Sequence, residues 1–464
     1  METIDWEAEG ERCVTLLQEL IRIPTVNRGS EGGTCERPAA ERLAEFFRAG
    51  GLEPVLLQPE PGRTSVVVRA KGGGDRPPIL LNAHLDVVEA DASRWRHDPF
   101  GGEIHDGFVW GRGAVDMKHM AAMGACVMAL LGRGAQGQRL DRDVIFAGVA
   151  DEEAGCRKGS MFLVEEYPDL VRAEYALGEI GGFSLHLFGR TFYPMQVAEK
   201  GICWVRATFH GEPGHGSMPD PNSSVMKLSR ALTRLGRGRL PMHPTEIVSR
   251  WITEMSSELP QPQRSILRRL KTPQVAGLIL DHLIRDADQR RSFGALLSNT
   301  ATPTVVRGGT KVNVIPSRAS VEIDGRTLPG QTANSFLAEL RAALGPEGED
   351  AELEVLSDIA PLVVDHGTPL FAHLGAVLRR HDPLGIPLPF MIPGFTDAKA
   401  YARLGTKCYG FAPVRFDLAH DLNFSRMYHG DDERIPVVGL KWGLRVLFDA
   451  VVGFCSGEAR AAVV

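Results

Sequence analysis

The amino-acid sequence predicts an α/β fold of two domains, in which a smaller α+β insertion interrupts an α/β domain. Apolar strands alternate with amphipathic helices in the first part of the chain, as in layered α/β domains. Residues 205–209 and 320–324 instead alternate polar with apolar side chains, as half-buried antiparallel strands do. The chain of 464 residues also exceeds one ordinary hydrophobic core. We therefore expect a first domain made of residues 1–197 and 328–464, and an insertion made of residues 198–327.

Capping residues and apolar runs predict the elements of the first domain. Asp5 is placed to cap a first helix that Pro24 ends, and Gly50 follows a second helix over residues 39–49. A third helix is expected just after Asp116. Strands are predicted at residues 55–57, 65–69, 79–82, 144–149 and 175–177.

The later elements follow from the same patterns. A helix is expected over residues 223–235, and residues 244–299 are expected to be mostly helical with breaks at prolines. The α/β pattern resumes with residues 336–340 and ends with a helix over residues 437–454.

Composition and charge exclude several classes of protein. Hydrophobic residues make up 43% and charged residues 24%, as in globular proteins. The net charge of -6, with both signs interspersed, argues against a nucleic-acid partner. The acidic N-terminus is not expected to act as a signal peptide, and the longest apolar run, residues 121–131, is too short to span a membrane. Seven scattered cysteines without C-x-x-C spacing favour a cytoplasmic location and a metal site, if any, made of histidines and carboxylates.

Acidic residues and a histidine form three clusters near the ends of apolar runs. His84 and Asp86 form the first cluster, Asp116 the second, and residues 151–153 the third. A buried strand that ends in such a residue offers a rigid ligand at the edge of a sheet. Because crowded carboxylates repel one another unless cations neutralise them, the clusters predict a metal site and a two-metal hydrolase.

Each cluster also has a second interpretation when it is taken alone. His84 and Asp86 suit an ordinary surface loop, Asp116 suits a helix N-cap, and the acidic run suits a solvated turn. Adjacent carboxylates leaving a strand point in different directions, so one of Glu152 and Glu153 can bind metal while the other serves as general base. Glu179 repeats the pattern after another strand, or is an exposed acid in a glycine-rich turn.

The insertion adds three candidates. His215 lies in a glycine-rich loop, and Asn313 and Arg326 flank its last strands. An asparagine and an arginine so placed can clamp a carboxylate or an oxyanion. Taken alone, the three are a surface histidine, a turn residue and a surface cation.

Two later segments complete the candidates. The loop from Gly394 to Thr396 enters a helix, whose N-terminus favours anions. His420 and His429 compete for a last position near the final helix. We prefer His429 because the turn after it leads straight into that helix.

Together these segments resemble the family of aminoacylase, succinyl-diaminopimelate desuccinylase and glutamate carboxypeptidase, which are co-catalytic zinc peptidases. The resemblance covers nearly the whole chain. It rests on Asn82-Ala83-His84-Leu85-Asp86-Val87-Val88, Gly111-Arg112-Gly113-Ala114-Val115-Asp116-Met117-Lys118, Asp151-Glu152-Glu153, Gly214-His215, and His429 with Glu433.

The resemblance implies a three-layer catalytic domain with an inserted α+β lid that also dimerises. It further implies two zinc ions, for which cobalt or manganese can substitute. Asp116 would bridge the two ions, His84 and Glu179 would complete one site, and Glu153 and His429 would complete the other.

The same resemblance implies the roles of the remaining residues. Asp86 would orient His84, and Glu152 would take a proton from the water that bridges the metals and pass it to the leaving amine. His215 would reach the active site of the other subunit of a homodimer and polarise the scissile carbonyl. The expected substrate contacts are Asn313, Arg326, Gly394 and Thr396.

Two features depart from the family pattern. Met117 stands where many members have aspartate, so the strained peptide bond of the family would fall between Asp116 and Met117. The insertion at residues 244–299 resembles that of longer members, which include carboxypeptidases and hydrolases of N-fatty-acyl amino acids. Its apolar stripes, within residues 247–255 and 275–284, either pack the lid or form a wall for a bulky apolar group.

We therefore expect a metal-dependent hydrolase that cleaves an amide or peptide bond next to a free carboxylate. Its small-molecule substrate would be an N-acyl amino acid or a short peptide. A zinc aminopeptidase is one alternative, against which the lid motifs around His215 and Asn313 count. A non-catalytic binding protein is another, against which the complete set of ligands counts.

Overall fold

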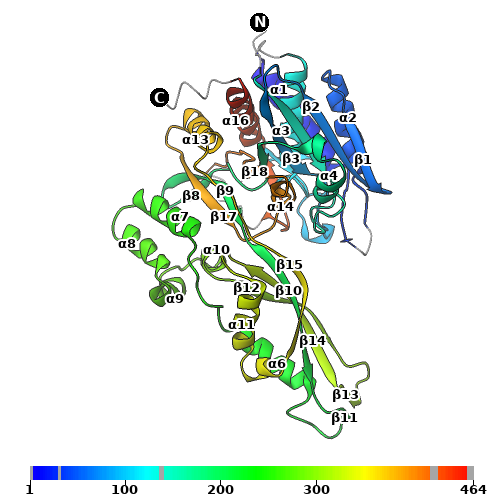
Figure 1. Ribbon diagram of the computed structural model, residues 1–464, viewed down its shortest axis with the longest axis vertical. Helices are drawn as coiled ribbons and strands as arrows, with labels where there is room; N and C mark the ends of the chain where they lie inside the picture. Colours follow the sequence, from blue (N-terminus) through cyan, green and yellow to red (C-terminus); the bar gives the residue numbers. More distant parts are fainter. Residues whose placement is uncertain (1–3, 30–32, 135–139, 418–426, 457–464) are drawn as a thin grey trace. The chain divides into compact units, whose positions relative to one another are not determined.

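The computed structural model describes residues 4–29, 33–134, 140–417 and 427–456, which form two compact units (Figure 1). The first unit comprises Met1–Val197, Val364–Leu388 and Thr396–Val464, and the second comprises Ala198–Val363 and Pro389–Phe395. The expected α/β class is confirmed, because the first unit is built on a mixed sheet whose central strands are parallel.

The second unit extends further along the chain than the expected boundary at residue 328. Helix α11 (Ala333–Leu344) and strand β15 (Glu352–Ile359) belong to it. The reason is that β15 pairs antiparallel with β10 (Gly201–His210), and α11 buries Phe336 against the same sheet. A short apolar helical pattern does not say which sheet the helix will cover.

The largest sheet, most of whose strands belong to the first unit, has the order β1-β2-β6-β3-β7-β18-β9-β16, and β8 and β17 also pair with β9. Strands β6, β3 and β7 are parallel neighbours, so their carboxyl ends meet at one edge of the sheet. The strands are β1 (Val55–Glu60), β2 (Arg63–Ala70), β3 (Arg76–His84), β6 (Arg142–Val149), β7 (Tyr175–Gly178), β8 (Leu185–Leu187), β9 (Arg190–Glu199), β16 (Leu362–Val363), β17 (Ile386–Ile392) and β18 (Lys407–Gly410).

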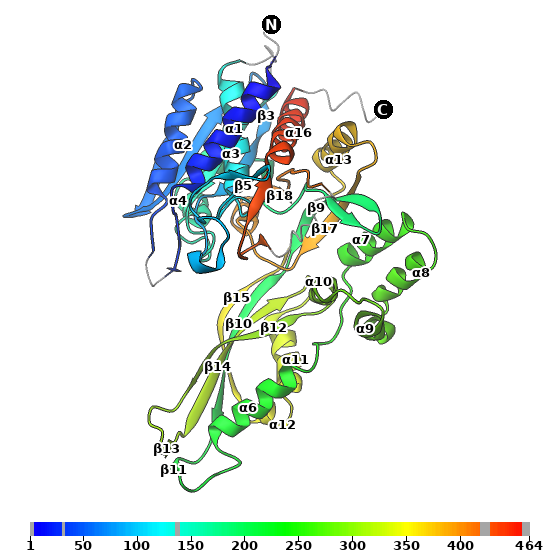
Figure 2. The ribbon, with the colours of Figure 1, turned by 180° about the vertical axis from the view of Figure 1, so that it is seen from behind.

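Helices cover both faces of this sheet, which gives the first unit three layers (Figure 1 and Figure 2). Helix α3 lies on β3 and packs against three other helices, and α4 and α14 contribute to the apolar core on the opposite face. The Asp5 carboxylate accepts the main-chain N–H groups of Glu7 and Ala8, as expected of an N-cap. The helices are α1 (Trp6–Ile21), α2 (Arg37–Ala49), α3 (Lys118–Gly132), α4 (Ser160–Glu166), α5 (Pro168–Val171), α13 (Pro369–His381), α14 (Ala398–Ala402) and α16 (Val437–Cys455).

The second unit is built on an antiparallel sheet with the strand order β12-β14-β10-β15. Its inward side chains, such as Phe209 and Val321, pack against Leu228 of α6 and Leu340 of α11. These apolar contacts explain the alternation seen in the sequence, because only one face of each strand meets the helices. The other elements of this sheet region are α6 (Ser224–Leu235), β11 (Gly214–His215), β12 (Thr300–Gly308), β13 (Val314–Ile315), β14 (Arg318–Thr327) and α12 (Pro346–Glu349).

The expected helical insertion is confirmed as α7 (Glu246–Ser257), α8 (Gln263–Arg268), η4 (Arg269–Lys271), α9 (Pro273–His282) and α10 (Ala287–Leu297). The apolar stripe of α7 is packing surface, since Trp251 is 5% exposed and its ring lies 5.5 Å from that of Phe293. The second stripe is divided, because Ile279 is buried while Leu278 and Leu283 are exposed.

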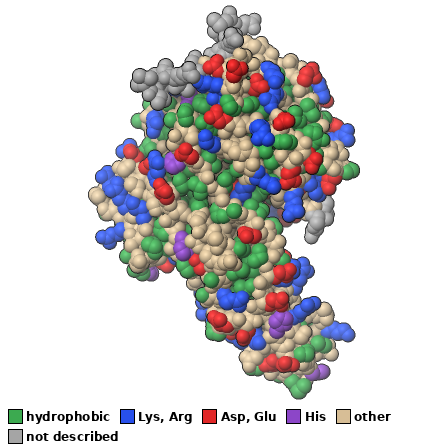
Figure 3. Space-filling model, in the orientation of Figure 1, with side chains coloured by type: hydrophobic (Ala, Val, Ile, Leu, Met, Phe, Trp, Pro, Cys, Tyr) green, Lys and Arg blue, Asp and Glu red, His purple; other side chains and the backbone are tan. Residues whose placement is uncertain are grey.

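Short elements complete the first unit. A small antiparallel sheet has the strand order β19-β5-β4. Strands β4 and β5 come before α3 in the sequence, and β19 comes just before α16. Among the described residues, no helix is long and apolar enough to cross a membrane. On the face drawn in Figure 3, Lys and Arg side chains are interspersed with Asp and Glu side chains. The short elements are η2 (Ala92–Arg94), β4 (Ile104–His105), β5 (Phe108–Trp110) and β19 (Arg434–Pro436).

Candidate metal centre

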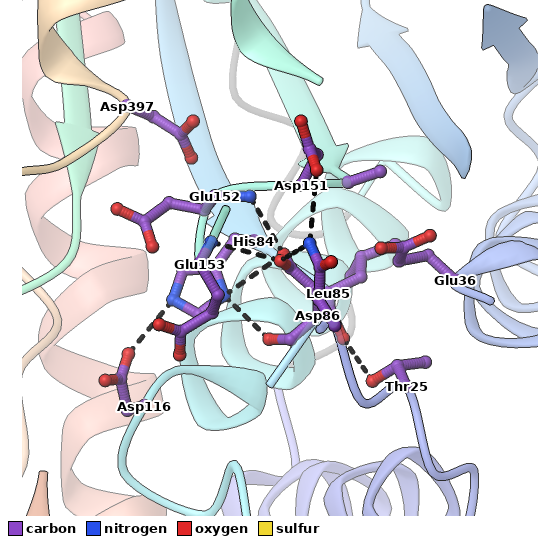
Figure 4. A network of polar contacts seen from close by, with 12 residues as sticks. Thr25, Glu36, His84, Leu85, Asp86, Asp116, Asp151, Glu152, Glu153 and Asp397 are labelled. Atoms are coloured by element: carbon purple, nitrogen blue, oxygen red, sulfur yellow. Dashed lines mark hydrogen bonds and ion pairs between the residues drawn. The ribbon is translucent and has the colours of Figure 1, made fainter. Parts of the chain in front are cut away.

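Three adjacent parallel strands deliver the acidic clusters to one edge of the sheet. Strand β3 ends at His84, whose register partner on β6 is Val149, and the acidic run follows two residues later. Strand β7 ends at Gly178 and is followed at once by Glu179. The register therefore explains why residues far apart in the sequence meet at this edge (Figure 4).

Two groups of ligand atoms share the Asp116 carboxylate. His84 Nε2 lies 3.0 Å from Asp116 Oδ1 and 3.6 Å from Glu179 Oε2. His429 Nε2 lies 3.3 Å from Asp116 Oδ2 and 3.1 Å from Glu153 Oε2. Within each group the potential ligand atoms all lie within 4.8 Å of one another. The structure thus brings together all five residues expected as metal ligands, with one oxygen of Asp116 in each group.

The chemistry of these residues fits two divalent cations. Imidazole nitrogens and carboxylate oxygens are common ligands of zinc and related ions. Glu153 Oε1 is buried and, among the described residues, has no hydrogen-bond partner. Burial raises the pKa of Glu179 to about 8, to which the negative charge of Asp116 contributes. Carboxylates placed in this way require positive charge to remain ionised.

The two histidines stand where positive charge is favoured. Contacts with Asp116 and then Glu153 raise the pKa of His429 to about 10. Burial by itself would lower the pKa of His84, but its hydrogen bonds to Asp116 and Glu179 raise that pKa well above its ordinary value. Burial by itself would raise the pKa of Asp116, but the hydrogen bonds and charges of both histidines hold that pKa below its usual range. The site therefore attracts protons or cations to the same positions.

Asp86 contacts His84 through its main chain. The ring nitrogen Nδ1 of His84 donates to the Asp86 carbonyl oxygen at 2.9 Å, whereas the Asp86 carboxylate lies 3.7 Å from it. This bond favours the tautomer that leaves Nε2 free to bind a metal. The carboxylate instead accepts the N–H groups of Glu152 and Glu153, each at 3.1 Å. Asp86 thus orients both the histidine and the acidic turn.

Glu152 lies beside the two groups and is buried, with 8% of the residue exposed. Figure 4 shows the Glu153 side chain lying toward Asp116, while the Glu152 side chain leaves the turn in another direction. Burial raises the pKa of Glu152 well above its ordinary value, and the negative charge of Glu179 adds to the shift. Such a carboxylate is a stronger proton acceptor, as a general base must be.

A buried ion pair holds the loop that carries Asp116. Glu433 Oε1 accepts the N–H groups of Val115 at 2.6 Å and Asp116 at 2.9 Å. Its other oxygen accepts Gly113 N–H at 3.1 Å and lies 2.7 Å from Arg112 Nη1. The peptide bond between Asp116 and Met117 is cis. Sequence patterns associated Glu433 with the site but did not indicate this contact.

A group of four buried polar residues next to the site was not predicted. Asn82 Nδ2 donates to Asp397 Oδ2 at 2.9 Å, and Ser160 Oγ donates to the other oxygen at 2.5 Å. Asn82 also accepts the Tyr401 hydroxyl at 2.7 Å. Asn82, Asp397 and Tyr401 line a small cavity, which Glu179 and Thr396, a predicted substrate contact, also line. An asparagine inside an otherwise apolar strand, two residues before His84, is a signal that could have identified this contact.

The remaining predicted residues lie in the second unit. His215 is exposed on β11 beside β13, and the Asn313 carbonyl accepts Gly216 N–H at 2.9 Å, so these two candidates share one turn. Arg326 binds both oxygens of Asp324, at 2.7 and 3.1 Å. Gly394 belongs to the same unit. The competing candidate His420 lies outside the described residues.

A separate histidine–carboxylate group lies on the surface of the first unit, at His97, Glu103 and His105. Its two imidazole rings are stacked 3.8 Å apart with an interplanar angle of 7°. Nearly parallel ring planes do not meet at a nearby point, whereas a shared ion lies in the plane of each ring that binds it. This group therefore differs from the two that share Asp116.

Known proteins share both the sequence and the fold. The chain is 29% identical over 450 residues to N-fatty-acyl-amino acid synthase/hydrolase PM20D1 of Xenopus tropicalis, which covers 90% of this chain and 82% of that protein. It is 27% identical over 422 residues to aminoacylase-1 of Sus scrofa, and the match covers 89% of this chain and 90% of that protein. The M20 family metallo-carboxypeptidase Sso-CP2 from Sulfolobus solfataricus has the same fold, with a TM-score of 0.68 and 17% identity. The match covers 95% of this chain and 98% of that structure.

A family model supplies the assignment. Residues 80–452, well over half of the chain, match the model of Peptidase family M20/M25/M40. The matched region contains all five residues expected as metal ligands and Glu152. The chain therefore belongs to Peptidase family M20/M25/M40 and is a hydrolase that acts on amide or peptide bonds.

Proposed function

We propose that the protein hydrolyses the amide bond of an N-acyl amino acid or short peptide next to a free carboxylate, with two divalent cations in the Asp116 site. The observation that carries the proposal is that the two oxygens of Asp116 face separate groups, one at His84 and one at His429. A shared carboxylate between two ligand sets is the arrangement that a two-metal hydrolase requires. Zinc suits this donor set, and cobalt or manganese can replace it.

The residues around the cations divide the work of hydrolysis. When bound, the cations polarise the scissile carbonyl and lower the pKa of the attacking water. Glu152 accepts the proton of that water and delivers it to the departing amine nitrogen, so the carboxyl returns to its ionised form. Asp86 holds the main chain of Glu152 and fixes the tautomer of His84. Because these groups are buried, the low dielectric constant around them strengthens their electrostatic interactions.

The substrate class rests on the relatives. The relative from Xenopus tropicalis is named for N-fatty-acyl amino acids, and the relative from Sus scrofa is named an aminoacylase. An N-acyl amino acid is therefore the first substrate class to test, and the last peptide bond of a short peptide is likewise an amide bond next to a free carboxylate.

The lid supplies the other part of the proposal. We infer that the chain acts as a homodimer in which His215 of one subunit serves the active site of the other. His215 is exposed at the end of the second unit's β11 strand, in the turn that Asn313 closes, and is therefore available to a second chain. His215→Ala should lower kcat while leaving metal content unchanged, and a monomer in sedimentation would contradict the dimer.

The Glu152→Gln variant tests the mechanism. It keeps the size and polarity of the side chain but removes its basicity, so turnover should fall by at least about 10²-fold. Metal content, measured by elemental analysis, should stay at that of the wild type. Glu166→Gln, an exposed change in α4, is the matched control. Full activity of Glu152→Gln would exclude the assigned role.

A substrate panel tests the chemistry of recognition. An N-acyl amino acid, its C-terminal amide, a dipeptide and its N-acetyl form are incubated with the enzyme and Zn²⁺, Co²⁺ or Mn²⁺. Loss of cleavage on C-amidation alone supports recognition of the carboxylate. Loss on N-acetylation alone would instead indicate an aminopeptidase.

A further inference from the structure

A buried polar chain behind the site connects residues that no motif links to it. Asn27 is 7% exposed and lies in the segment between α1 and α2. Its Nδ2 donates to Asp86 Oδ2 at 2.9 Å and to Asp151 Oδ1 at 3.2 Å. Its Oδ1 accepts Arg63 Nη2 at 2.9 Å and Gly29 N–H at 3.0 Å. All four hydrogen-bonding positions of the amide are therefore in use.

Only an asparagine satisfies this set of partners. The ionised carboxylates of Asp86 and Asp151 only accept hydrogen bonds, and the guanidinium of Arg63 only donates them. These partners determine which end of the amide carries the oxygen and which the nitrogen. Arg63 also pairs with the buried carboxylate of Glu36, so the guanidinium is itself held in place. An aspartate at position 27 would put a third carboxylate against Asp86 and Asp151.

Both carboxylates that Asn27 holds act on the turn that carries the general base. Asp86 accepts the N–H groups of Glu152 and Glu153, and Figure 4 shows its carboxylate between that turn and the rest of the network. Asp151 has a left-handed backbone with φ of 66°, and its second oxygen accepts Lys158 N–H at 3.0 Å. A non-glycine residue keeps this conformation only when its surroundings hold it.

The segment that carries Asn27 is bound to the same strand end. Asn27 N–H donates to the Val87 carbonyl at 2.9 Å, Val87 N–H donates to the Thr25 carbonyl at 3.0 Å, and Thr25 Oγ1 donates to the Leu85 carbonyl at 2.6 Å. Bonds to the main chain of Leu85 and Val87, on both sides of Asp86, thus fix the position of the Asn27 amide relative to the turn that carries Glu152.

We propose that Asn27 is a positioning residue of the reaction, which aims Glu152 through the carboxylates of Asp86 and Asp151. The inference rests on the proposed function, because it assigns Glu152 the role of general base. Among the residues that the structure describes, Asn27 forms no hydrogen bond with an expected metal ligand or with the Glu152 carboxyl, so its effect passes through the turn.

The variants Asn27→Asp and Asn27→Ala test the inference. Asn27→Asp removes the donors and adds a buried charge, whereas Asn27→Ala removes the donors alone and carries the test if the first variant does not fold. Asn299→Asp is the matched control. Asn299 is 2% exposed and gives its amide to Glu339 at 2.8 Å, but it lies in the second unit.

Two readouts are measured on the full-length chain. The first is kcat and KM with saturating Zn²⁺, on the N-acyl amino acid that the wild type hydrolyses fastest. Misplacement of a reacting group by about 1 Å costs about 10²-fold. We therefore expect kcat to fall between about 10-fold and 10²-fold, with KM within threefold and metal content unchanged. The second readout is amide hydrogen exchange in a peptide covering residues 150–156, which should become faster in both Asn27 variants and stay unchanged in Asn299→Asp.

The outcomes separate the inference from the proposed function. Unchanged kcat and unchanged exchange in a folded Asn27→Ala variant would overturn the positioning role. An equal loss of kcat in Asn299→Asp would show a general effect on the fold and would overturn it too. If Glu152→Gln keeps its activity, or no substrate in the panel is cleaved, the proposed function fails, and hydrogen exchange still decides whether Asn27 holds the turn.

Discussion

His84 and Asp86 are joined by a main-chain bond, in which the imidazole Nδ1–H donates to the Asp86 carbonyl oxygen at 2.9 Å. The carboxylate of Asp86, 3.7 Å from the same nitrogen, is left to bind the main chain of the acidic turn. Asp86, two residues after a histidine that is expected to bind metal, therefore does two tasks with different atoms. This division can be tested by changing the carboxylate alone.

Asp86→Asn should lower turnover more than it lowers metal content. The substitution keeps the carbonyl that orients His84 but replaces one acceptor oxygen with a donor that faces N–H groups. We expect kcat to fall about 10²-fold while two metal ions per chain remain, measured by steady-state kinetics and elemental analysis. The control is Asp143→Asn, since Asp143 also accepts a main-chain N–H, that of Gly72 at 2.8 Å, near the opposite end of β6. A parallel loss of metal and activity in Asp86→Asn would show that the carboxylate orients the ligand after all.

Glu433→Gln should destabilise the protein strongly. Arg112 and Glu433 form an ion pair whose side chains are 2% and 0% exposed, and removal of one partner of such a pair costs about 3–5 kcal/mol. The loss should appear as a lower urea midpoint in circular dichroism. Glu41→Gln breaks an ion pair with Arg37 whose side chains are 45% and 58% exposed, and it should cost no more than about 0.5 kcal/mol. Similar midpoints for the two variants would contradict the importance of the buried pair.

Two glycine substitutions should have effects of opposite sign. A Cβ on Gly159 would lie 1.7 Å from the Ala150 carbonyl oxygen, next to the acidic turn, so Gly159→Ala should destabilise by about 1–3 kcal/mol or more. A Cβ on Gly277, within α9, meets nothing within 4 Å. Gly277→Ala should therefore stabilise by about 0.5–1 kcal/mol, because alanine favours the helix. Thermal unfolding measures both, and an unchanged melting temperature for Gly159→Ala would contradict the close approach.

Lys200 should make stability depend on pH above neutrality. Burial lowers the pKa of its ammonium group to about 7, with Arg326 nearby adding to the shift, whereas a lysine in the unfolded chain has a pKa of about 10.4. Between these values the unfolded state binds more protons, so this group makes the free energy of unfolding rise with pH. From pH 7 to pH 10 the rise should be on the order of 3 kcal/mol.

The variants Lys200→Met and Lys71→Met check this sign. Lys200→Met should lose that rise, while Lys71→Met, which changes a side chain that is 78% exposed, should keep it. Urea unfolding at pH 7, 8.5 and 10 provides the free energies. Equal pH dependence in Lys200→Met and the wild type would contradict the lowered pKa.

Sequence patterns were most informative where function and strand order coincide. The strand-end positions of His84, Glu153 and Glu179 predicted that they would meet at one edge of a parallel sheet, and the family resemblance implied that they bind metal. The boundary after residue 327 was placed too early, because pairing between β10 and β15 joins segments about 150 residues apart. No local pattern encodes such a partner.

By itself, the sequence determined the α/β class and the motifs that carry the family resemblance, because apolar periodicity and residue chemistry are local properties of the chain, and that resemblance indicated which residues to expect as metal ligands. Only the tertiary structure decided which atom each polar side chain uses. The two oxygens of Asp116 are divided between His84 and His429, and Asp86 serves His84 through its carbonyl. Asn27 joins the site only because the fold buries its amide between two carboxylates and a guanidinium, and buried polar groups must find partners wherever packing places them.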